Sequence, residues 1–169
     1  MVMATTMLKG NVVNLAGDFI AVGEMAPEFS LVRGNLGSMG LGELRGKNVI
    51  LNIFPSLDTA VCASSVRKFN KIASEMENTV VLCISKDLPF AQTRFCTTEG
   101  LENVVPLSDF RFDSSFGRDY GLLMVDGPLK GLLARSIVVV SPEGKVVYTE
   151  LVPEIAEEPD YKAALDVLA

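Results

Sequence analysis

Two short apolar runs, separated by an amphipathic stretch, limit what this chain can fold into. Residues 47–54 (KNVILNIF) and 79–84 (TVVLCI) are almost continuously apolar or β-branched, and residues 136–140 (SIVVV) repeat the pattern. Runs of this kind are typical of strands that are buried on both faces. Between the first two runs, apolar residues recur at spacings of three and four from Val61 to about Met76, which predicts an amphipathic helix. The chain is therefore expected to form an α/β fold.

The remaining segments extend this alternation. Three further helices are predicted, over residues 87–100, 114–120 and 160–168. The first has Asp87 as N-cap and Pro89 in its first turn, and the last has Asp160 as N-cap. Further strands are predicted over residues 29–32, 103–107 and 145–151, and the last of these forms a hairpin with 136–140. Residues 11–13 and 19–22 are predicted to form an N-terminal hairpin. This order implies a mixed sheet with helices on both faces. The 169 residues correspond to a single domain, 1–169, with residues 1–22 as a hairpin extension.

The chain contains no histidine. Ser-His-Asp catalysis, Cys-His catalysis and every histidine-containing zinc or haem site are thereby excluded, and no metal or other cofactor is expected. With 15 Lys and Arg against 21 Asp and Glu, the net charge is −6, which argues against binding of nucleic acid or of an anionic membrane surface. The sequence shows neither a secretory signal nor a membrane-spanning segment, so a cytoplasmic location is expected.

Three cysteines remain as candidates for chemistry: Cys62, Cys83 and Cys96. Cys62 falls in the first turn of the predicted helix, just beyond the carboxyl end of a central strand, where open α/β sheets place their sites. Unpaired amide groups and the helix dipole stabilise a thiolate there. Pro55 fixes the exit from the strand, and Thr59 is placed to direct its hydroxyl into the same pocket. The alternative is that Thr59 or Asp58 is a simple N-cap and Cys62 a buried residue of the first turn.

A thiolate in a chain without histidine needs an arginine or a lysine as its cation. The basic residues of the predicted helix at 61–76 belong to its solvated face. Arg135 differs, because it stands between the turn-rich residues 127–131 and the buried strand at 136–140. Its fork of donors suits an oxyanion or a thiolate, although a salt bridge at the strand edge is an equal alternative. Cys83, in the middle of an apolar strand, is expected to behave as an inert small hydrophobe.

Several motifs resemble the thiol peroxidase subfamily of the peroxiredoxins. Residues 55–62, Pro-Ser-Leu-Asp-Thr-Ala-Val-Cys, resemble the peroxidatic motif Pro-x-x-x-Thr-x-x-Cys of that family. Residues 23–29, with the pattern Gly-x-x-Ala-Pro-x-Phe, resemble a motif near the start of the family's domain, and residues 87–96, 126–135 and 158–161 are similar to later blocks of the subfamily. The resemblance runs in order over nearly the whole chain.

The resemblance implies a thioredoxin-like fold with an N-terminal β-hairpin extension and an enzyme that reduces hydrogen peroxide and alkyl hydroperoxides. It implies that Cys62 attacks the peroxide and becomes a sulfenic acid, that Pro55 shields the sulfur from water, and that Thr59 binds thiolate and peroxide. It assigns to Arg135 the binding of the peroxide oxygens and the stabilisation of the thiolate. Cys96 would be the resolving cysteine, forming an intramolecular disulfide that thioredoxin reduces. A homodimer is also implied.

A Cys62–Cys96 disulfide requires the two Cα atoms to lie within roughly 4.4–6.8 Å. Because Cys96 lies inside or near the end of a predicted helix, we expect residues 94–98 to unwind on oxidation, together with the first turn after Cys62. A disulfide reductase is disfavoured, because Thr59 stands where a Cys-x-x-Cys motif has its first cysteine. The alternative class is a non-catalytic redox-sensing or holdase-type interaction protein, in which Cys62 would not react with peroxide.

Overall fold

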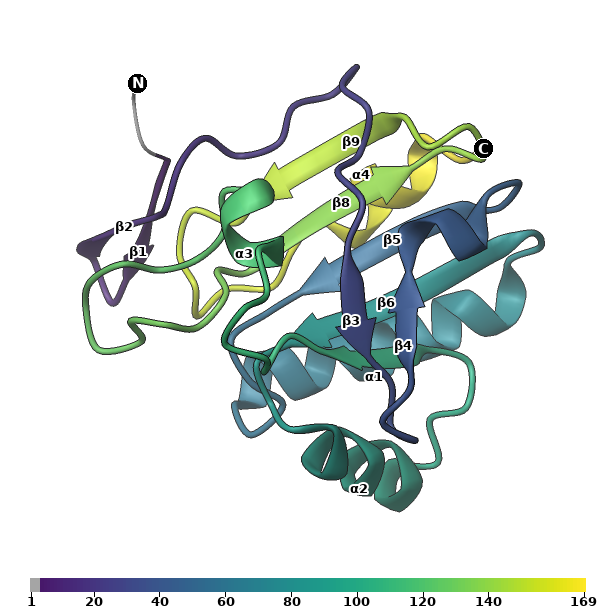
Figure 1. The fold of residues 1–169 in the computed structure, drawn as a ribbon, viewed down its shortest axis with the longest axis horizontal. Helices are drawn as coiled ribbons and strands as arrows, with labels where there is room; N and C mark the ends of the chain where they lie inside the picture. The colour runs from purple at the N-terminus through teal and green to yellow at the C-terminus, as the bar shows by residue number, and fades with distance from the viewer. Residues whose placement is uncertain (1–3) are drawn as a thin grey trace.

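The computed structural model describes residues 4–169, so residues 1–3 of the predicted extension lie outside the described residues. The strands of its main sheet are β3 (Ser30–Val32), β4 (Ser38–Gly40), β5 (Asn48–Ile53), β6 (Thr79–Ser85), β7 (Val105–Ser108), β8 (Ser136–Val140) and β9 (Val146–Leu151). Their order across the sheet is β4-β3-β7-β6-β5-β8-β9 (Figure 1). Because β5 runs parallel to β6 but antiparallel to β8, the expected mixed sheet is confirmed.

The central strand β5 is buried on both faces, as its sequence predicts. Ile50, Leu51 and Ile53 are fully shielded from solvent. Ile50 belongs to the hydrophobic cluster on one side of the sheet, and Leu51 and Ile53 belong to the cluster on the other side. Since each face carries its own apolar layer, the sheet requires cover on both sides.

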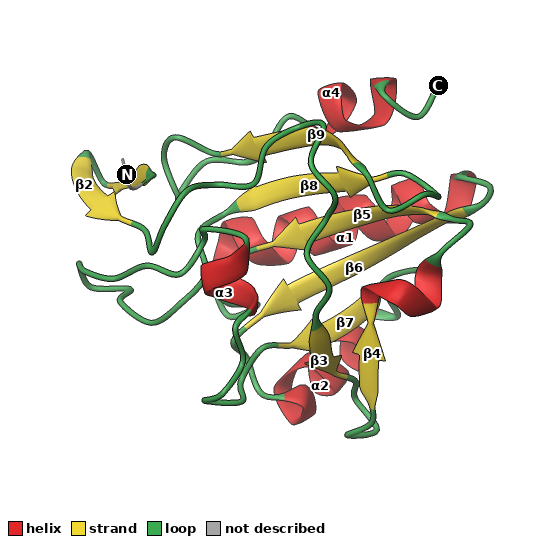
Figure 2. Cartoon of the chain, turned by 45° about the horizontal axis from the view of Figure 1, so that its top comes forward, coloured by secondary structure: helices red, strands yellow, loops and turns green. Residues whose placement is uncertain are grey.

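Helices provide this cover on both faces of the sheet (Figure 2). They are the 3-10 helix η1 (Leu41–Leu44) and the α-helices α1 (Ala60–Glu75), α2 (Pro89–Glu99), α3 (Phe116–Asp119) and α4 (Tyr161–Asp166). Phe69 of α1, Phe95 of α2 and Ala164 of α4 pack on one face. Phe116 of α3 and Leu44 of η1 pack on the other, so the predicted arrangement is confirmed. Within residues 4–169, none of the helices has the length and apolar character needed to cross a membrane.

The ends of α2 and α4 test the predicted helix signals. Gly100 ends α2 in the left-handed conformation, with φ 68°, and the Asp160 carboxylate accepts a hydrogen bond from the Ala163 amide at the start of α4. Both predictions are confirmed. The predicted capping role of Asp87 is wrong, because Leu88 occupies the N-cap position of α2. The Asp87 side chain turns instead to donors in the loop that follows β5, which lies far away in sequence.

An N-terminal hairpin is present, but with a different partner strand from the predicted one. β1 (Thr5–Leu8) pairs antiparallel with β2 (Asn11–Asn14), and residues 19–22 form no strand. Lys9 and Gly10, which connect the two strands, both have positive φ, 51° and 80°. A two-residue turn of this kind matches the twist of paired strands, which explains why the hairpin closes here. Figure 1 shows the hairpin beyond the carboxyl ends of β5 and β6.

Candidate active site

Cys62 lies where the sequence predicts, in the first turn of α1. The helix begins at Ala60, directly after the loop that leaves the carboxyl end of β5. The first amide groups of a helix have no acceptor within the helix, and the helix dipole adds positive potential, so this position stabilises a negatively charged sulfur. Cys62 is 0% exposed, so the sulfur is shielded from bulk solvent.

Arg135 lies next to Cys62: its Nη2 donates a hydrogen bond to Cys62 Sγ at 3.0 Å. The reason is the pairing of the strands. Arg135 directly precedes β8, whose first residue, Ser136, pairs with Ile53 at the end of β5. The residue before β8 therefore reaches the edge of the sheet from which α1 starts. The two residues are 73 positions apart, and no spacing rule in the sequence brings them together.

Arg135 is a buried cation, 2% exposed. Its Nε donates to the carbonyl of Ile155 at 2.8 Å, and within residues 4–169 it forms no ion pair with a carboxylate. The alternative of a salt bridge at the strand edge is therefore wrong. An uncompensated buried guanidinium is costly, and the Cys62 sulfur is the acceptor that lies against it. Nη1 is also buried and has no hydrogen-bond partner in the described part of the chain, which leaves it able to donate to a bound oxygen.

The Thr59 hydroxyl takes a different partner from the expected one. Its Oγ1 donates to the carbonyl of Ser56 at 2.9 Å, and no hydrogen bond to Cys62 Sγ is formed. Thr59 is the N-cap residue of α1 by position but makes no side-chain cap bond, so the simple capping role is not observed either. Because a hydroxyl has a single proton, Thr59 presents only its lone pairs to the space beside it.

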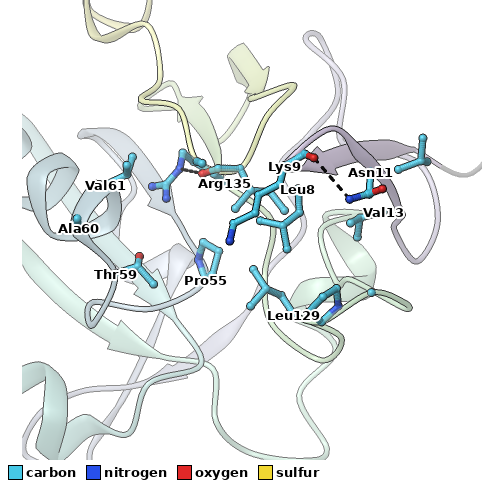
Figure 3. Close-up of a pocket in the computed structure, with 15 residues that line it drawn as sticks. Leu8, Lys9, Asn11, Val13, Pro55, Thr59, Ala60, Val61, Leu129 and Arg135 are labelled. Carbon is cyan, nitrogen blue, oxygen red and sulfur yellow. Dashed lines mark hydrogen bonds between the residues drawn. The ribbon is translucent and has the colours of Figure 1, made fainter.

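A cavity of about 590 Å³ opens beside Arg135 (Figure 3). Most of its wall is apolar and comes from four parts of the chain: residues 8–9 and 11–13 of the hairpin, Pro55 with residues 59–61, residues 127–129, and residues 155–156. Pro55, Thr59 and Arg135 all line it, so three of the predicted site residues meet at one cavity. The cavity leads to the guanidinium that holds the sulfur of Cys62.

The hairpin wall of this cavity is fixed by two carboxylates that sequence reasoning did not single out. Glu154 accepts hydrogen bonds from the amides of Lys9 and Gly10 at 2.9 and 3.1 Å, and these bonds lower the pKa of its carboxyl. Asp126 accepts from the amide and the side chain of Asn14, at 2.9 and 2.7 Å, and its pKa is lowered for the same reason. More than a hundred residues separate the partners in each contact, so local sequence patterns contain no signal for them.

The other two cysteines differ in environment, and all three are unpaired thiols. Cys96 is half-buried on α2, where desolvation raises its pKa. It lies within α2, about two helical turns or about 10 Å along the axis beyond Pro89. Cys83 is fully buried on β6, and burial raises its pKa to about 12. Cys83 therefore stays protonated at neutral pH, which agrees with the inert role expected for it.

A thioredoxin-like mixed sheet that presents a thiol at a helix N-terminus, beside a buried arginine, defines a thiol-dependent oxidoreductase. The sequence pattern of the Redoxin family matches residues 21–165. The chain is 58% identical to the thiol peroxidase of Mycobacterium tuberculosis over 166 residues, 98% of this chain and 99% of the relative. It is 55% identical to the thiol peroxidase of Corynebacterium glutamicum, with the same coverage of 98% and 99%.

A crystal structure of a peroxiredoxin-like protein from Aquifex aeolicus has the same fold, with a TM-score of 0.91 and 43% identity over 99% of this chain and 98% of that one. The chain therefore belongs to the Redoxin family and, within it, to the thiol peroxidase subfamily of the peroxiredoxins. It is a peroxiredoxin-type oxidoreductase, as its motifs predict.

Proposed function

We propose that Cys62 is the nucleophile with which this thiol-dependent peroxidase reduces hydroperoxides. The observation that carries the proposal is the 3.0 Å contact between Arg135 Nη2 and Cys62 Sγ, because it pairs a sulfur at a helix N-terminus with a buried cation. The thiolate attacks the terminal oxygen of the hydroperoxide, and the O–O bond breaks. Cys62 is left as a sulfenic acid, and a proton completes the departing oxygen as an alcohol, or as water from hydrogen peroxide.

The residues around the sulfur have distinct roles in this reaction. Arg135 Nη1, which has no other partner in residues 4–169, donates to the oxygens of the hydroperoxide and stabilises the charge that develops on them. Thr59 accepts a hydrogen bond from the O–H of the hydroperoxide, because its own proton is committed to Ser56. Pro55 is buried and has no N–H, so it excludes water from the sulfur without competing for the negative charge.

Cys96 is the resolving cysteine in this proposal. Its thiol attacks the sulfenic sulfur of Cys62, water leaves, and an intramolecular disulfide forms. Because the bond requires Cα atoms within roughly 4.4–6.8 Å, residues 94–98 at the end of α2 unwind, together with the first turn of α1. Unwinding also exposes the Cys96 thiol and removes the desolvation that raises its pKa. A dithiol protein of the thioredoxin type then reduces the disulfide by exchange.

The substrates proposed are hydrogen peroxide and alkyl hydroperoxides. The apolar wall of the cavity beside Arg135 favours an alkyl group, since burying it there removes apolar surface from water. Arg135 and Thr59 line the same cavity and receive the peroxide group.

Two further features complete the proposal. The enzyme acts in a reducing compartment such as the cytoplasm, because Cys62 returns to the thiol after each turnover. It forms a homodimer, in keeping with its resemblance to other peroxiredoxins. The fully exposed ring of Phe112, in the loop after β7, supports this assembly, because a large apolar side chain in water favours association. Sedimentation of the wild type and of Phe112→Asp tests the dimer.

Rapid mixing with hydrogen peroxide tests the main proposal. We expect one equivalent of peroxide at micromolar concentration to oxidise the wild type and to leave Cys62→Ser unchanged. The mass of the tryptic peptides then shows a link between Cys62 and Cys96. A wild type that does not react would instead indicate the non-catalytic interaction protein, and a link through Cys83 or between chains would contradict the role of Cys96.

A further inference from the structure

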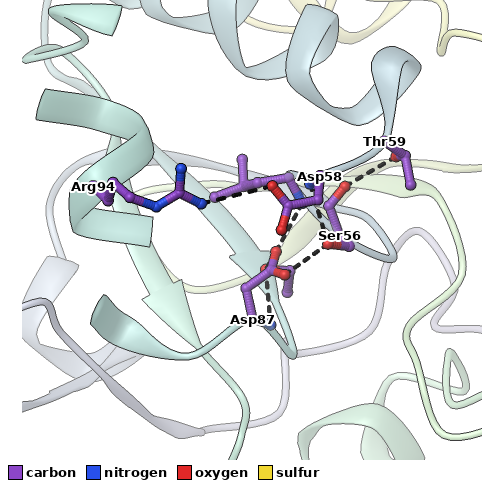
Figure 4. Close-up of polar contacts among 7 residues, drawn as sticks. Ser56, Asp58, Thr59, Asp87 and Arg94 are labelled. Carbon is purple, nitrogen blue, oxygen red and sulfur yellow. Dashed lines mark hydrogen bonds and ion pairs between the residues drawn. The ribbon is translucent and has the colours of Figure 1, made fainter. Parts of the chain in front are cut away.

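A carboxylate outside the chemistry described above joins the loop before α1 to the segment before α2. Asp87 Oδ1 accepts a hydrogen bond from the Ser56 hydroxyl at 2.6 Å, and Oδ2 accepts from the Leu57 amide and the Ser85 hydroxyl, each at 2.7 Å (Figure 4). These four residues are called the Asp87 cluster below. Hydrogen bonds to an ionised carboxylate are shorter and stronger than those between neutral groups, so the cluster is a firm attachment.

The Asp87 cluster fixes the backbone that presents Thr59. The Ser56 carbonyl accepts from the Thr59 hydroxyl at 2.9 Å and from the Thr59 amide at 3.2 Å. The Ser56 hydroxyl oxygen also accepts from the Asp58 amide at 3.1 Å. Ser56, held by Asp87, therefore sets the turn through which the chain enters α1, in whose first turn Cys62 lies.

The same carboxylate belongs to the segment that leads to Cys96. Asp87 lies between β6 and α2, and its carbonyl accepts a hydrogen bond from the Ser108 hydroxyl of β7, which anchors it to the sheet. Its side chain does not cap α2. Its side-chain donors come instead from the loop before α1 and from Ser85 at the end of β6, so one anchored carboxylate connects the segments of both cysteines.

We propose that Asp87 is a positioning residue that holds Pro55 and Thr59 in the arrangement that reacts with hydroperoxide, and that it releases them when Cys62 joins Cys96. The inference rests on the proposed function. Forming the disulfide moves the first turn of α1 and the loop before it away from the position that Asp87 fixes. A weakened Asp87 cluster therefore favours the open arrangement both before and after oxidation. The attack on hydroperoxide becomes slower and the closure of the disulfide becomes faster.

A neighbouring ion pair provides the control for this effect. Asp58 Oδ1 lies 3.7 Å from Arg94 Nη2 and links the same loop to α2, but the two side chains are 73% and 67% exposed. A single exposed pair at this distance contributes little. Asp58→Asn therefore makes the same chemical change as Asp87→Asn, in the same part of the molecule, without affecting the Asp87 cluster.

The test separates the two steps of oxidation. Asp87→Asn keeps the size of the side chain and removes its charge. Ser56→Ala removes one hydrogen-bond donor to Asp87 and replaces the first variant if that variant does not fold. Each variant is made alone and with Cys96→Ser, mixed rapidly with hydrogen peroxide, and quenched with an alkylating reagent. Intact mass then counts thiol, sulfenic acid, disulfide and sulfinic acid.

In the Cys96→Ser background, we expect Asp87→Asn to lower the rate constant of Cys62 oxidation about tenfold, which corresponds to the loss of one hydrogen bond to a charged group. With Cys96 present, the disulfide should form about tenfold faster from the sulfenic acid, so that less sulfinic acid accumulates at excess peroxide. Ser56→Ala should change both steps in the same directions and by less. Asp58→Asn should stay within about twofold of the wild type in both.

The opposite signs of the two changes distinguish positioning from a general loss of structure. Slowing of both steps together, or rates equal to the wild type in both, would overturn the inference. Unchanged kinetics in Asp87→Asn would overturn this inference alone, whereas a wild type whose Cys62 resists hydroperoxide would overturn the proposed function and this inference with it.

Discussion

Arg67 on α1 and Glu99 at the end of α2 form a two-point ion pair, with Nε 3.0 Å from Oε2 and Nη2 2.8 Å from Oε1. The hydrogen bonds from Arg67 lower the pKa of Glu99. Glu99 lies about one helical turn beyond Cys96, so the pair holds the part of α2 that unwinds in the proposed reaction to the helix that carries Cys62.

The pair makes the end of α2 sensitive to acid. Because the folded pKa of Glu99 lies below its unfolded value of about 4.5, the stabilisation is fully present above that value and is lost as the pH falls through the folded pKa. We expect the amides of residues 94–99 to exchange hydrogen about twofold faster in Glu99→Gln than in the wild type at neutral pH, and the difference to disappear at low pH. Hydrogen-exchange mass spectrometry measures this. Lys162→Gln is the control, because it removes a comparable exposed pair with Asp166 in α4. The prediction is contradicted if residues 94–99 exchange at the same rate in Glu99→Gln and in the wild type at neutral pH.

Replacement of Arg135 should slow the first oxidation step. Arg135→Met removes the counterion of the sulfur and the spare Nη1 donor, so the rate constant of Cys62 oxidation should fall about 10- to 100-fold. Arg135→Lys keeps the charge but lacks the planar guanidinium whose N–H groups reach the sulfur, the carbonyl and the substrate together. Its rate constant of Cys62 oxidation should be about tenfold lower than that of the wild type. Stopped-flow mixing with peroxide measures both. Arg118→Met, at an exposed position of α3, should react like the wild type.

Loosening the hairpin should affect bulky substrates selectively. Glu154→Gln weakens the acceptor of the Lys9 and Gly10 amides, so the cavity wall becomes less ordered. We expect the KM for cumene hydroperoxide to rise about threefold and the KM for hydrogen peroxide to change little, because the small substrate does not need the apolar wall. Steady-state assays with both substrates decide this, with Glu157→Gln as the exposed control. An equal rise in KM for both substrates would mean that the cavity wall does not discriminate between bulky and small hydroperoxides.

Cys83 should be chemically silent. With a pKa raised by burial to about 12, it has almost no thiolate at pH 7, so iodoacetamide should not label it in the native protein. Cys83→Ala should keep the peroxidase rate within about twofold and lower the free energy of unfolding by about 1 kcal/mol, because it leaves a small gap under α1. Peptide mapping and urea unfolding measure these effects. Rapid labelling of Cys83 would show that β6 opens more readily than its burial implies.

Cys96→Ser should separate oxidation from turnover. Cys62 should still form a sulfenic acid at the rate of the wild type, because the hydrogen bonds of Arg135 within residues 4–169 go to Cys62 Sγ and the Ile155 carbonyl and do not involve Cys96. Turnover in a thioredoxin-coupled assay should be lost, and sulfinic acid should accumulate at excess peroxide. Sustained turnover in this variant would show that another thiol, or the reductant itself, resolves the sulfenic acid.

The parts of the fold that the sequence predicts are those set by local pattern. The unbroken apolar runs of β5, β6 and β8 and the spacing in α1 define the sheet and the place of Cys62. The sequence predicts the wrong partner strand for the hairpin, because the turn depends on Lys9 at positive φ, and lysine is not a typical residue for that conformation. Leu15, which lies between the two predicted hairpin strands at 11–13 and 19–22, instead forms an isolated bridge with Met124.

The contacts that complete the site are the ones that no local pattern contains. The motif resemblance places Cys62, Thr59 and Arg135 in one site, but the partners of these side chains depend on which strands pair. The Ile155 carbonyl accepts a hydrogen bond from Arg135 Nε, and the Ser56 carbonyl accepts one from the Thr59 hydroxyl. The sequence predicts Asp87 as a helix cap because Asp before Pro is a start signal, whereas the side chain accepts hydrogen bonds from Ser56 and Leu57, about 30 residues earlier, and from Ser85.

The contact of Glu154 with Lys9 spans 145 residues, and it has a consequence for the newly made protein. Contacts between such distant segments form late in folding, because the chain entropy of closing so long a loop opposes them. A ribosome exposes Cys62 well before it adds Arg135 and Ile155, and during that interval the sulfur has neither its buried cation nor its cavity. In the proposed mechanism, the thiol therefore acquires its reactivity only as folding is completed, and the nascent chain is a poor target for the hydroperoxide that the finished enzyme reduces.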